Sequence, residues 1–330
     1  MLKKLTEPFW YLWVALASCH FSLAYVSRLG TNISIPDYVN GAAPVPYQYR
    51  VLCAWIMKGL LQIPLVVRLG SGSALLRHSP YLLSVLSIVA PALFLTIVCT
   101  RASVRVLTGN ENWSMLGGLV VLYMTYFSLA VNYELAYMLP YDIPSLLFFS
   151  AAIYLLLTRR YILYYPIFVL ATFNRETCIL IVPFFAICYW LTEHRNKWKL
   201  IAHIGVQVCL WILVKLWLHR LFAGNTSDQA LGGLFALRLF FNLKELVKPW
   251  QWPPLASIFG FLLPVYVVGF RYIKDRRLAI GGATTLCLWL GAMLIVGNLI
   301  EIRIFTEMNS IMALSITTIG YGLWQSSRRA

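Results

Sequence analysis

The sequence is poor in charge, and above all in acidic charge. Of its 330 residues 12% are charged, and only 12 Asp and Glu stand against 27 Lys and Arg. The seven cysteines form no CxxC pair, and neither they nor the histidines show a spacing suited to zinc. No stretch alternates as a lipid-facing β-barrel strand does. These absences argue against a soluble globular enzyme, a zinc module and a membrane β-barrel.

Apolar sequence fills the chain instead. Hydrophobic residues make up 60% of it, and its mean hydropathy is +0.73. About 20 apolar residues in a helix span a bilayer core of about 30 Å, and such runs recur from end to end. The sequence therefore predicts an all-α, polytopic transmembrane helical bundle of about ten spans. We expect residues 1–330 to form a single integral membrane domain.

The basic residues indicate how the spans are oriented. The formal net charge is +15, and Lys and Arg concentrate in the short turns between apolar runs. Basic turns stay in the cytoplasm, which predicts a multi-pass protein of the inner membrane with both termini cytoplasmic. The first apolar run is longer than that of a signal peptide, so we expect an uncleaved first span. Membrane lipids and anionic substrates are the expected partners, and nucleic acid is not.

Two longer segments interrupt this pattern on the predicted outer side, at residues 27–78 and 222–252. The first begins with a Gly- and Pro-rich stretch, residues 27–50, and continues into residues 51–70, which are apolar but carry basic positions. That composition predicts an amphipathic helix in the interface, with a short true span as the alternative. The second segment combines a polar part with an amphipathic part.

Ionisable side chains inside membrane spans cost about 2.5–3.5 kcal/mol each on insertion scales, which makes them candidates for a functional site. In the predicted topology six of the 12 acids fall at the outer ends of spans. Residues 174–176 interrupt a region that otherwise forms two unusually short helices, and such a break needs a cavity lined by protein or water. The predicted outer cavity contains Asp37, Tyr49, Arg50, Glu134, Asp142, Asn174, Arg175, Glu176, Glu301 and Arg303.

Structural explanations stay open for several of these residues. Arg303 and Glu307 would pair if their segment is an α-helix, because they are four residues apart. Arg175 and Glu176 could neutralise each other or partners elsewhere. Asp142 could cap the helix that follows it. Asp37 could simply form a turn after Pro36, and Glu134 could be an ordinary polar residue at the membrane interface.

The order of features resembles a known superfamily. A first outer loop with an acid, a surface helix, a bundle of spans and a second outer amphipathic segment are similar to the GT-C membrane glycosyltransferases. The pieces PYQYRVL, YDIPSLLFF, FNRETCIL and EIRIFTEMN look like bacterial members. The resemblance covers most of the chain and is mainly architectural. Family members often carry paired acids in the first loop, whereas this loop has Asp37 alone. No cofactor is therefore assigned, and a divalent metal stays open.

This resemblance implies transfer of a hexosyl or pentosyl group from a polyprenyl-phosphate-linked donor to a glycan or lipid acceptor on the outer face, in cell-envelope polysaccharide biosynthesis. One carboxylate must take the acceptor's proton, and that role is assigned to Asp37. Cations must stabilise the phosphate leaving group, and Arg50 and Arg175 are assigned to this. The remaining candidates would orient the sugar or these arginines.

Three other functions stay open. An O-antigen-type polymerase would use similar lipid-linked glycans, and its product would be a lengthened polymer. A lipid-linked glycan transporter or flippase would place its site near the midplane between internal repeats, but the two halves show no repeat. A structural or assembly subunit is the third, since no motif excludes it.

Overall fold

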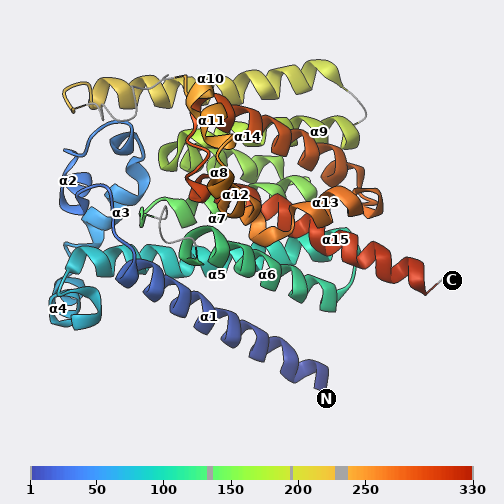
Figure 1. The fold of residues 1–330 in the computed structure, drawn as a ribbon, viewed down its shortest axis with the longest axis horizontal. Helices are drawn as coiled ribbons and strands as arrows, with labels where there is room; N and C mark the ends of the chain where they lie inside the picture. The colour runs from blue at the N-terminus through green and yellow to red at the C-terminus, as the bar shows by residue number, and fades with distance from the viewer. Residues whose placement is uncertain (1, 132–136, 194–195, 227–236, 329–330) are drawn as a thin grey trace.

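The computed structural model describes residues 2–131, 137–193, 196–226 and 237–328, and within these ranges all regular structure is helical, with no strand (Figure 1). The all-α prediction is confirmed. The α-helices are α1 (Leu2–Arg28), α2 (Ile35–Asn40), α3 (Val51–Leu60), α4 (Pro64–Gly72), α5 (Pro80–Thr108), α6 (Glu111–Tyr126), α7 (Asp142–Leu157), α8 (Tyr161–Asn174), α9 (Val182–Thr192), α10 (Lys197–Leu221), α11 (Leu239–Leu246), α12 (Trp252–Ala256), α13 (Leu263–Gly269), α14 (Ala283–Val296) and α15 (Asn309–Ser327). Several short 3₁₀ and π segments lie between them, and the three that matter for the site are the 3₁₀ segments η1 (Tyr47–Tyr49), η4 (Glu176–Ile181) and η10 (Ile302–Met308).

Several of these helices are long and apolar enough to cross a membrane, as expected of a membrane protein. Among the described residues there are 5 such segments, and a bent pair, α3 and α4, adds a sixth if the two form one span. The predicted count of about ten is not confirmed, because α7, α8 and the η4–α9 segment are apolar but shorter. The 5 segments are Glu7–Arg28, Pro80–Thr108, Glu111–Val131, Lys197–Leu221 and Arg277–Val296.

Residues 27–78, called the first outer segment after their predicted location, fold differently from the prediction. Residues 51–70 do not form one amphipathic helix, because α3 and α4 are bent by 93° relative to each other. The break lies just before Pro64, which occupies the first turn of α4. Proline lacks an amide hydrogen and its ring clashes with a preceding helical turn, so a new helix starts there. At its far end α4 packs tightly on the start of α5, where a Cβ on Gly70 would lie 2.4 Å from Pro80 Cα.

Short polar sequences set the helix boundaries. Gly109 ends α5 in the left-handed conformation, with φ +64°, and the side chain of Asn110 accepts a hydrogen bond from the amide of Trp113 in the first turn of α6. These are the conformations that glycine and asparagine adopt most readily at helix ends. The two helices are therefore joined by a tight turn and pack side by side.

Small residues let the bundle close tightly around α6. A Cβ on Gly118 would lie 2.8 Å from the ring of Trp10 on α1 and 2.9 Å from Ile97 on α5. Close approach of this kind is the usual way that membrane helices gain packing energy. By contrast, α10 lies along one edge of the bundle and buries very little of its surface (Figure 1).

The first outer segment lies away from both ends of the chain. In Figure 1 α2, α3 and α4 gather at the left, whereas α1 begins at the bottom and α15 ends at the right, well apart from each other. The first outer segment is thus separated from both ends of the chain by the length of the helices.

Candidate functional site

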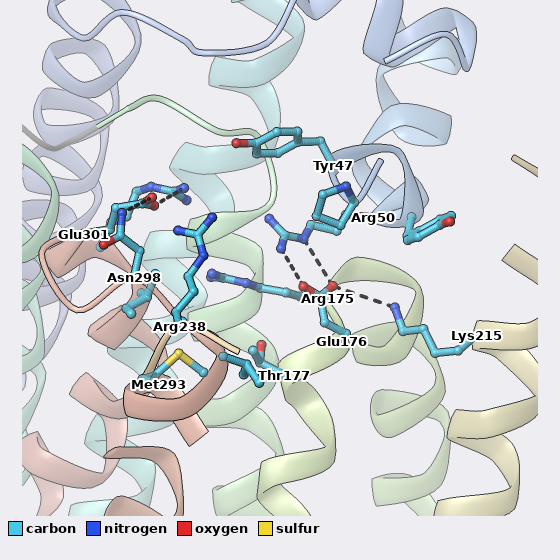
Figure 2. A pocket seen from close by; sticks show the side chains of 16 residues that line it. Tyr47, Arg50, Arg175, Glu176, Thr177, Lys215, Arg238, Met293, Asn298 and Glu301 are labelled. Carbon is cyan, nitrogen blue, oxygen red and sulfur yellow. Dashed lines mark hydrogen bonds and ion pairs between the residues drawn. The ribbon is translucent and has the colours of Figure 1, made fainter. Parts of the chain in front are cut away.

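A cavity of about 230 Å³ lies where the first outer segment, η4, α10, the end of α14 and η10 meet (Figure 2). Its wall contains both charged and apolar side chains. The lining residues are Pro46, Tyr47, Tyr49, Arg50, Arg175, Glu176, Thr177, Lys215, Arg238, Met293, Val296, Gly297, Asn298, Glu301, Arg303 and Ile304.

Positive charge dominates this wall. Five lining side chains are cationic and two are carboxylates, an excess of three positive charges that the buried Asp142 and Glu307 behind the wall reduce to one. Cations this close together repel one another, and a low-dielectric surrounding strengthens the repulsion. An anionic ligand would relieve it. The lining cations are Arg50, Arg175, Lys215, Arg238 and Arg303, and the lining carboxylates are Glu176 and Glu301.

The break between α8 and η4 positions two of these residues. Asn174 ends α8, and Arg175 takes up an extended conformation, with φ −161° and ψ 142°, before the chain resumes as η4. This confirms the predicted interruption of two short helices at residues 174–176. In an extended segment, successive side chains point in opposite directions. Arg175 therefore forms an ion pair with the buried Asp142 of the bundle, whereas Glu176 forms one with Arg50.

Arg50 lies at the junction of η1 and α3, where it is buried. Its Nε and Nη2 donate to the two carboxylate oxygens of Glu176, at 3.2 and 2.5 Å. Its Nη1 donates to the hydroxyl of Tyr141 at 2.7 Å, and the guanidinium lies 4.6 Å from the centre of that ring. The planar guanidinium favours paired contacts of this kind, and stacking on the ring fixes its plane.

A second row of charges lies behind the cavity wall. Asp142 is fully buried and accepts from Arg175 at 3.3 Å and from Arg303 at 3.4 Å. Arg175 also pairs with the buried Glu307 at 3.0 Å, and Arg303 with Glu301 at 2.7 Å. The two arginines thus reach the cavity from a network of buried carboxylates that holds them in place.

This network differs from the pairing that helical spacing suggested. Arg303 pairs with Asp142 and Glu301, and Glu307 pairs with Arg175, so the expected pair of Arg303 with Glu307 is wrong. The reason is that the segment containing both residues, η10, is a 3₁₀ helix, which has about three residues per turn and does not bring positions four apart onto one face.

Lys215 is the most unusual member of the wall. It lies on the predominantly apolar helix α10, its side chain is 15% exposed, and its Nζ makes no hydrogen bond within the described residues. It forms a long ion pair with Glu176, whose Oε2 lies 3.8 Å from the Nζ. An ammonium group at such a position costs free energy, and it is retained only where it has a partner or a function.

The structure brings six of the predicted residues to the cavity: Tyr49, Arg50, Arg175, Glu176, Glu301 and Arg303. Asp142 and Asn174 lie behind its wall. Asn174 donates to the carbonyl of Tyr141 and the hydroxyl of Ser145, so it joins α8 to α7. Asp37 is not a lining residue, because it is exposed in the first turn of α2. Glu134 lies outside the described residues.

Tyr49 closes the wall toward α10. Its hydroxyl is hydrogen-bonded to Nδ1 of His219 at 3.0 Å. Burial raises the pKa of the Tyr49 phenol above its usual range, so the group stays neutral at physiological pH. Tyr49 therefore contributes a polar, uncharged edge to a cationic site.

Sequence reasoning missed Lys215 and Arg238 as site residues. Lys215 could have been found from the sequence, because it is a lone lysine within the apolar run of residues 200–221. The free-energy cost of a charge inside a membrane span, which selected the acids, applies to it equally. Arg238 immediately precedes α11, and its amide donates to the carbonyl of Ile295 at 2.7 Å. That contact joins the second outer segment to α14, and no local pattern in the sequence predicts it.

The described residues contain no group of three or more His, Cys, Asp or Glu arranged to hold a metal ion. Both lining carboxylates are instead engaged by arginine, Glu176 by Arg50 and Glu301 by Arg303. The cavity is thus organised around cations.

No family model, no curated protein and no solved structure matches this chain. Its function is therefore argued from the site alone.

Proposed function

We propose that the cavity binds the phosphate group of a polyprenyl-phosphate-linked sugar and that the protein transfers this sugar to an acceptor, as a membrane glycosyltransferase. The observation that carries the proposal is the set of five cations around one cavity, with the Nζ of Lys215 lacking a hydrogen-bond partner among the described residues. A phosphate offers several strong acceptor oxygens and would satisfy this excess of donors.

The reaction suits such a site. When the sugar leaves its lipid, the bond between the anomeric carbon and the phosphate oxygen breaks, and negative charge grows on the phosphate. Donors fixed in advance around that oxygen lower the barrier, because they need not reorganise as the charge develops. Arg50 and Arg175 are held by their own partners, as such a role requires.

The position of α10 supports a lipid-linked substrate. The same helix that carries Lys215 presents exposed apolar side chains, including Leu213, Leu216 and Trp217. A polyprenyl chain lying against this surface would place its phosphate beside Lys215 at the cavity. A free sugar phosphate would have no use for that apolar surface.

We assign the proton-accepting carboxylate to Glu301 rather than to Asp37. Asp37 is exposed on α2 and does not line the cavity. Of the two lining carboxylates, Glu176 is engaged by Arg50 through both oxygens. Glu301 contacts Arg303 through Oε2 only, while Oε1 accepts from the neutral amide of Asn298 at 3.0 Å. That second oxygen keeps a lone pair for the proton of an acceptor hydroxyl.

The topology proposed with this function has the cavity toward the outer face of a bacterial inner membrane and both termini cytoplasmic. The shorter apolar segments α7, α8 and η4–α9 would raise the 5 candidate spans to eight, and the stretch that contains α12 and α13, together with α15, would complete a GT-C-like bundle of about ten spans.

The test is an assay for release of polyprenyl phosphate from a membrane extract that contains lipid-linked sugars together with the glycan and lipid acceptors of the same membrane. Purified protein should release it, and Arg50→Ala should release at most a hundredth as much, a loss typical of removing one preorganised donor. Arg68→Ala is the matched control, because Arg68 is exposed on α4 in the same outer segment. Intact lipid-linked sugars with the wild type would contradict the proposal.

A further inference from the structure

We propose that the carboxylate of Glu176 is an internal competitor of the phosphate for Arg50 and Lys215, and that it swings away when the phosphate binds. The inference rests on the proposed function, since phosphate is the ligand with which Glu176 competes. In Figure 2 the Glu176 carboxylate lies between the two cations, with contacts drawn to both.

The contact geometry suits such a competition. Glu176 presents two oxygens to Nε and Nη2 of Arg50, at 3.2 and 2.5 Å. A phosphate presents a similar pair of oxygens to a guanidinium, so the two groups use the same donors. Both cannot hold this edge of Arg50 at once.

Arg50 does not depend on Glu176 for its position. Its Nη1 donates to the hydroxyl of Tyr141, and its guanidinium stacks on that ring, with the carbon 4.6 Å from the ring centre. Its backbone carbonyl accepts a hydrogen bond from the hydroxyl of Tyr38. The guanidinium would thus stay in place after Glu176 leaves.

Glu176 can move its side chain without moving its backbone. Its carbonyl accepts a hydrogen bond from Nε1 of Trp211 at 2.9 Å, which anchors the start of η4. Its side chain is 35% exposed and borders the cavity, whereas that of Arg50 is 9% exposed. Rotation about side-chain bonds is therefore enough to expose the donors of Arg50.

A competing carboxylate weakens phosphate binding and speeds release of the product. Polyprenyl phosphate carries more negative charge than the sugar-linked donor, so five cations alone would retain it strongly. Glu176 re-forms its contacts with Arg50 and Lys215 as the phosphate departs. It is therefore a determinant of product affinity, distinct from the residues that hold the phosphate.

The experiment titrates farnesyl phosphate and inorganic phosphate into purified wild-type protein and three variants, each first checked for a single size-exclusion peak. Glu176→Gln should lower the Kd about tenfold, because it removes the charge that competes for the charge-assisted bonds. Glu176→Asp should also bind more tightly, since the shorter side chain cannot engage both donors. Glu301→Gln makes the same charge change in the same cavity and should have a smaller effect.

The outcomes separate this inference from the proposed function. Weaker or unchanged binding in Glu176→Gln, while the wild type binds, overturns the competition and leaves the proposed function standing. Equal gains in Glu176→Gln and Glu301→Gln also overturn it, because they indicate a general charge effect. If none of the proteins binds either ligand, both proposals fail. If farnesyl phosphate binds more tightly than inorganic phosphate, the ligand is a lipid headgroup, and the reverse order identifies free phosphate. In either case, a gain in affinity that is specific to Glu176→Gln supports the competition.

Discussion

Arg303 and Asp142 are 161 residues apart in the sequence, yet Nη1 of Arg303 lies 3.4 Å from Oδ2 of Asp142 inside the bundle. Asp142 is completely buried and also contacts Arg175. One carboxylate at the start of α7 therefore holds two arginines of the cavity wall, one from the break after α8 and one from η10. The site depends on this long-range contact.

The first prediction concerns the stability of that contact. Asp142→Ala leaves Arg175 and Arg303 with less negative charge around them, and loss of one partner of a buried pair costs about 3–5 kcal/mol. We expect a large fall in the free energy of unfolding, measured by thermal or denaturant unfolding in detergent. Arg105→Ala, which breaks an exposed ion pair with Glu111, should have a much smaller effect. Similar losses in the two variants would contradict the role given to Asp142.

For Lys215 we expect a substitution to leave the free energy of unfolding unchanged or to raise it. Lys215→Met removes a costly ammonium group that has no hydrogen-bond partner in the described part of the chain and only a 3.8 Å ion pair with Glu176, so the variant should be as stable as the wild type or more so. Its affinity for farnesyl phosphate should fall about tenfold, because one charge-assisted contact is lost. Thermal unfolding and ligand titration on the same preparation measure both effects. A destabilised variant with unchanged affinity would show that Lys215 is structural.

Two carboxylate variants decide which residue accepts the proton. Glu301→Gln should reduce sugar transfer by about 10²–10⁴-fold, the usual contribution of a general base. Asp37→Asn should retain nearly full transfer, because Asp37 is exposed on α2 outside the cavity. The measurement is the rate of polyprenyl phosphate release at saturating donor. The reverse result would return the role to Asp37, as the sequence suggested.

The membrane orientation can be tested by cysteine labelling in a cysteine-free background. A cysteine at position 37 should react with an impermeant thiol reagent on intact cells. A cysteine at position 274 should react only after permeabilisation, because it lies near the end of α15, where the Nζ of Lys274 donates to Gln325. Labelling of position 274 alone on intact cells would invert the proposed topology.

Much of this architecture is visible in the sequence. Apolar runs and basic turns predict the all-helical bundle, and the polar residues 174–176 predict the break that forms one wall of the cavity. The cost of burying charge selects five charged residues that do meet there. These features depend on local composition, which a single sequence contains.

The remaining features depend on how distant segments pack. The pairing of Arg303 with Asp142 joins residues that no local spacing rule relates. Asp37 lies outside the cavity because of the way α2 is oriented, and its acidity alone could not show this. Hydropathy alone does not fix the number of spans, because α7 and α8 are apolar but each is shorter than a usual membrane helix.

The most direct test of the central claim compares farnesyl phosphate with farnesol as ligands of the purified protein. Because the cavity carries five cations, farnesyl phosphate should bind and farnesol should not. The double variant Arg50→Ala, Lys215→Met should lose most of the affinity for farnesyl phosphate, and Arg68→Ala should keep it. Equal binding of the two lipids, or unchanged affinity in the double variant, would contradict a phosphate site in this cavity.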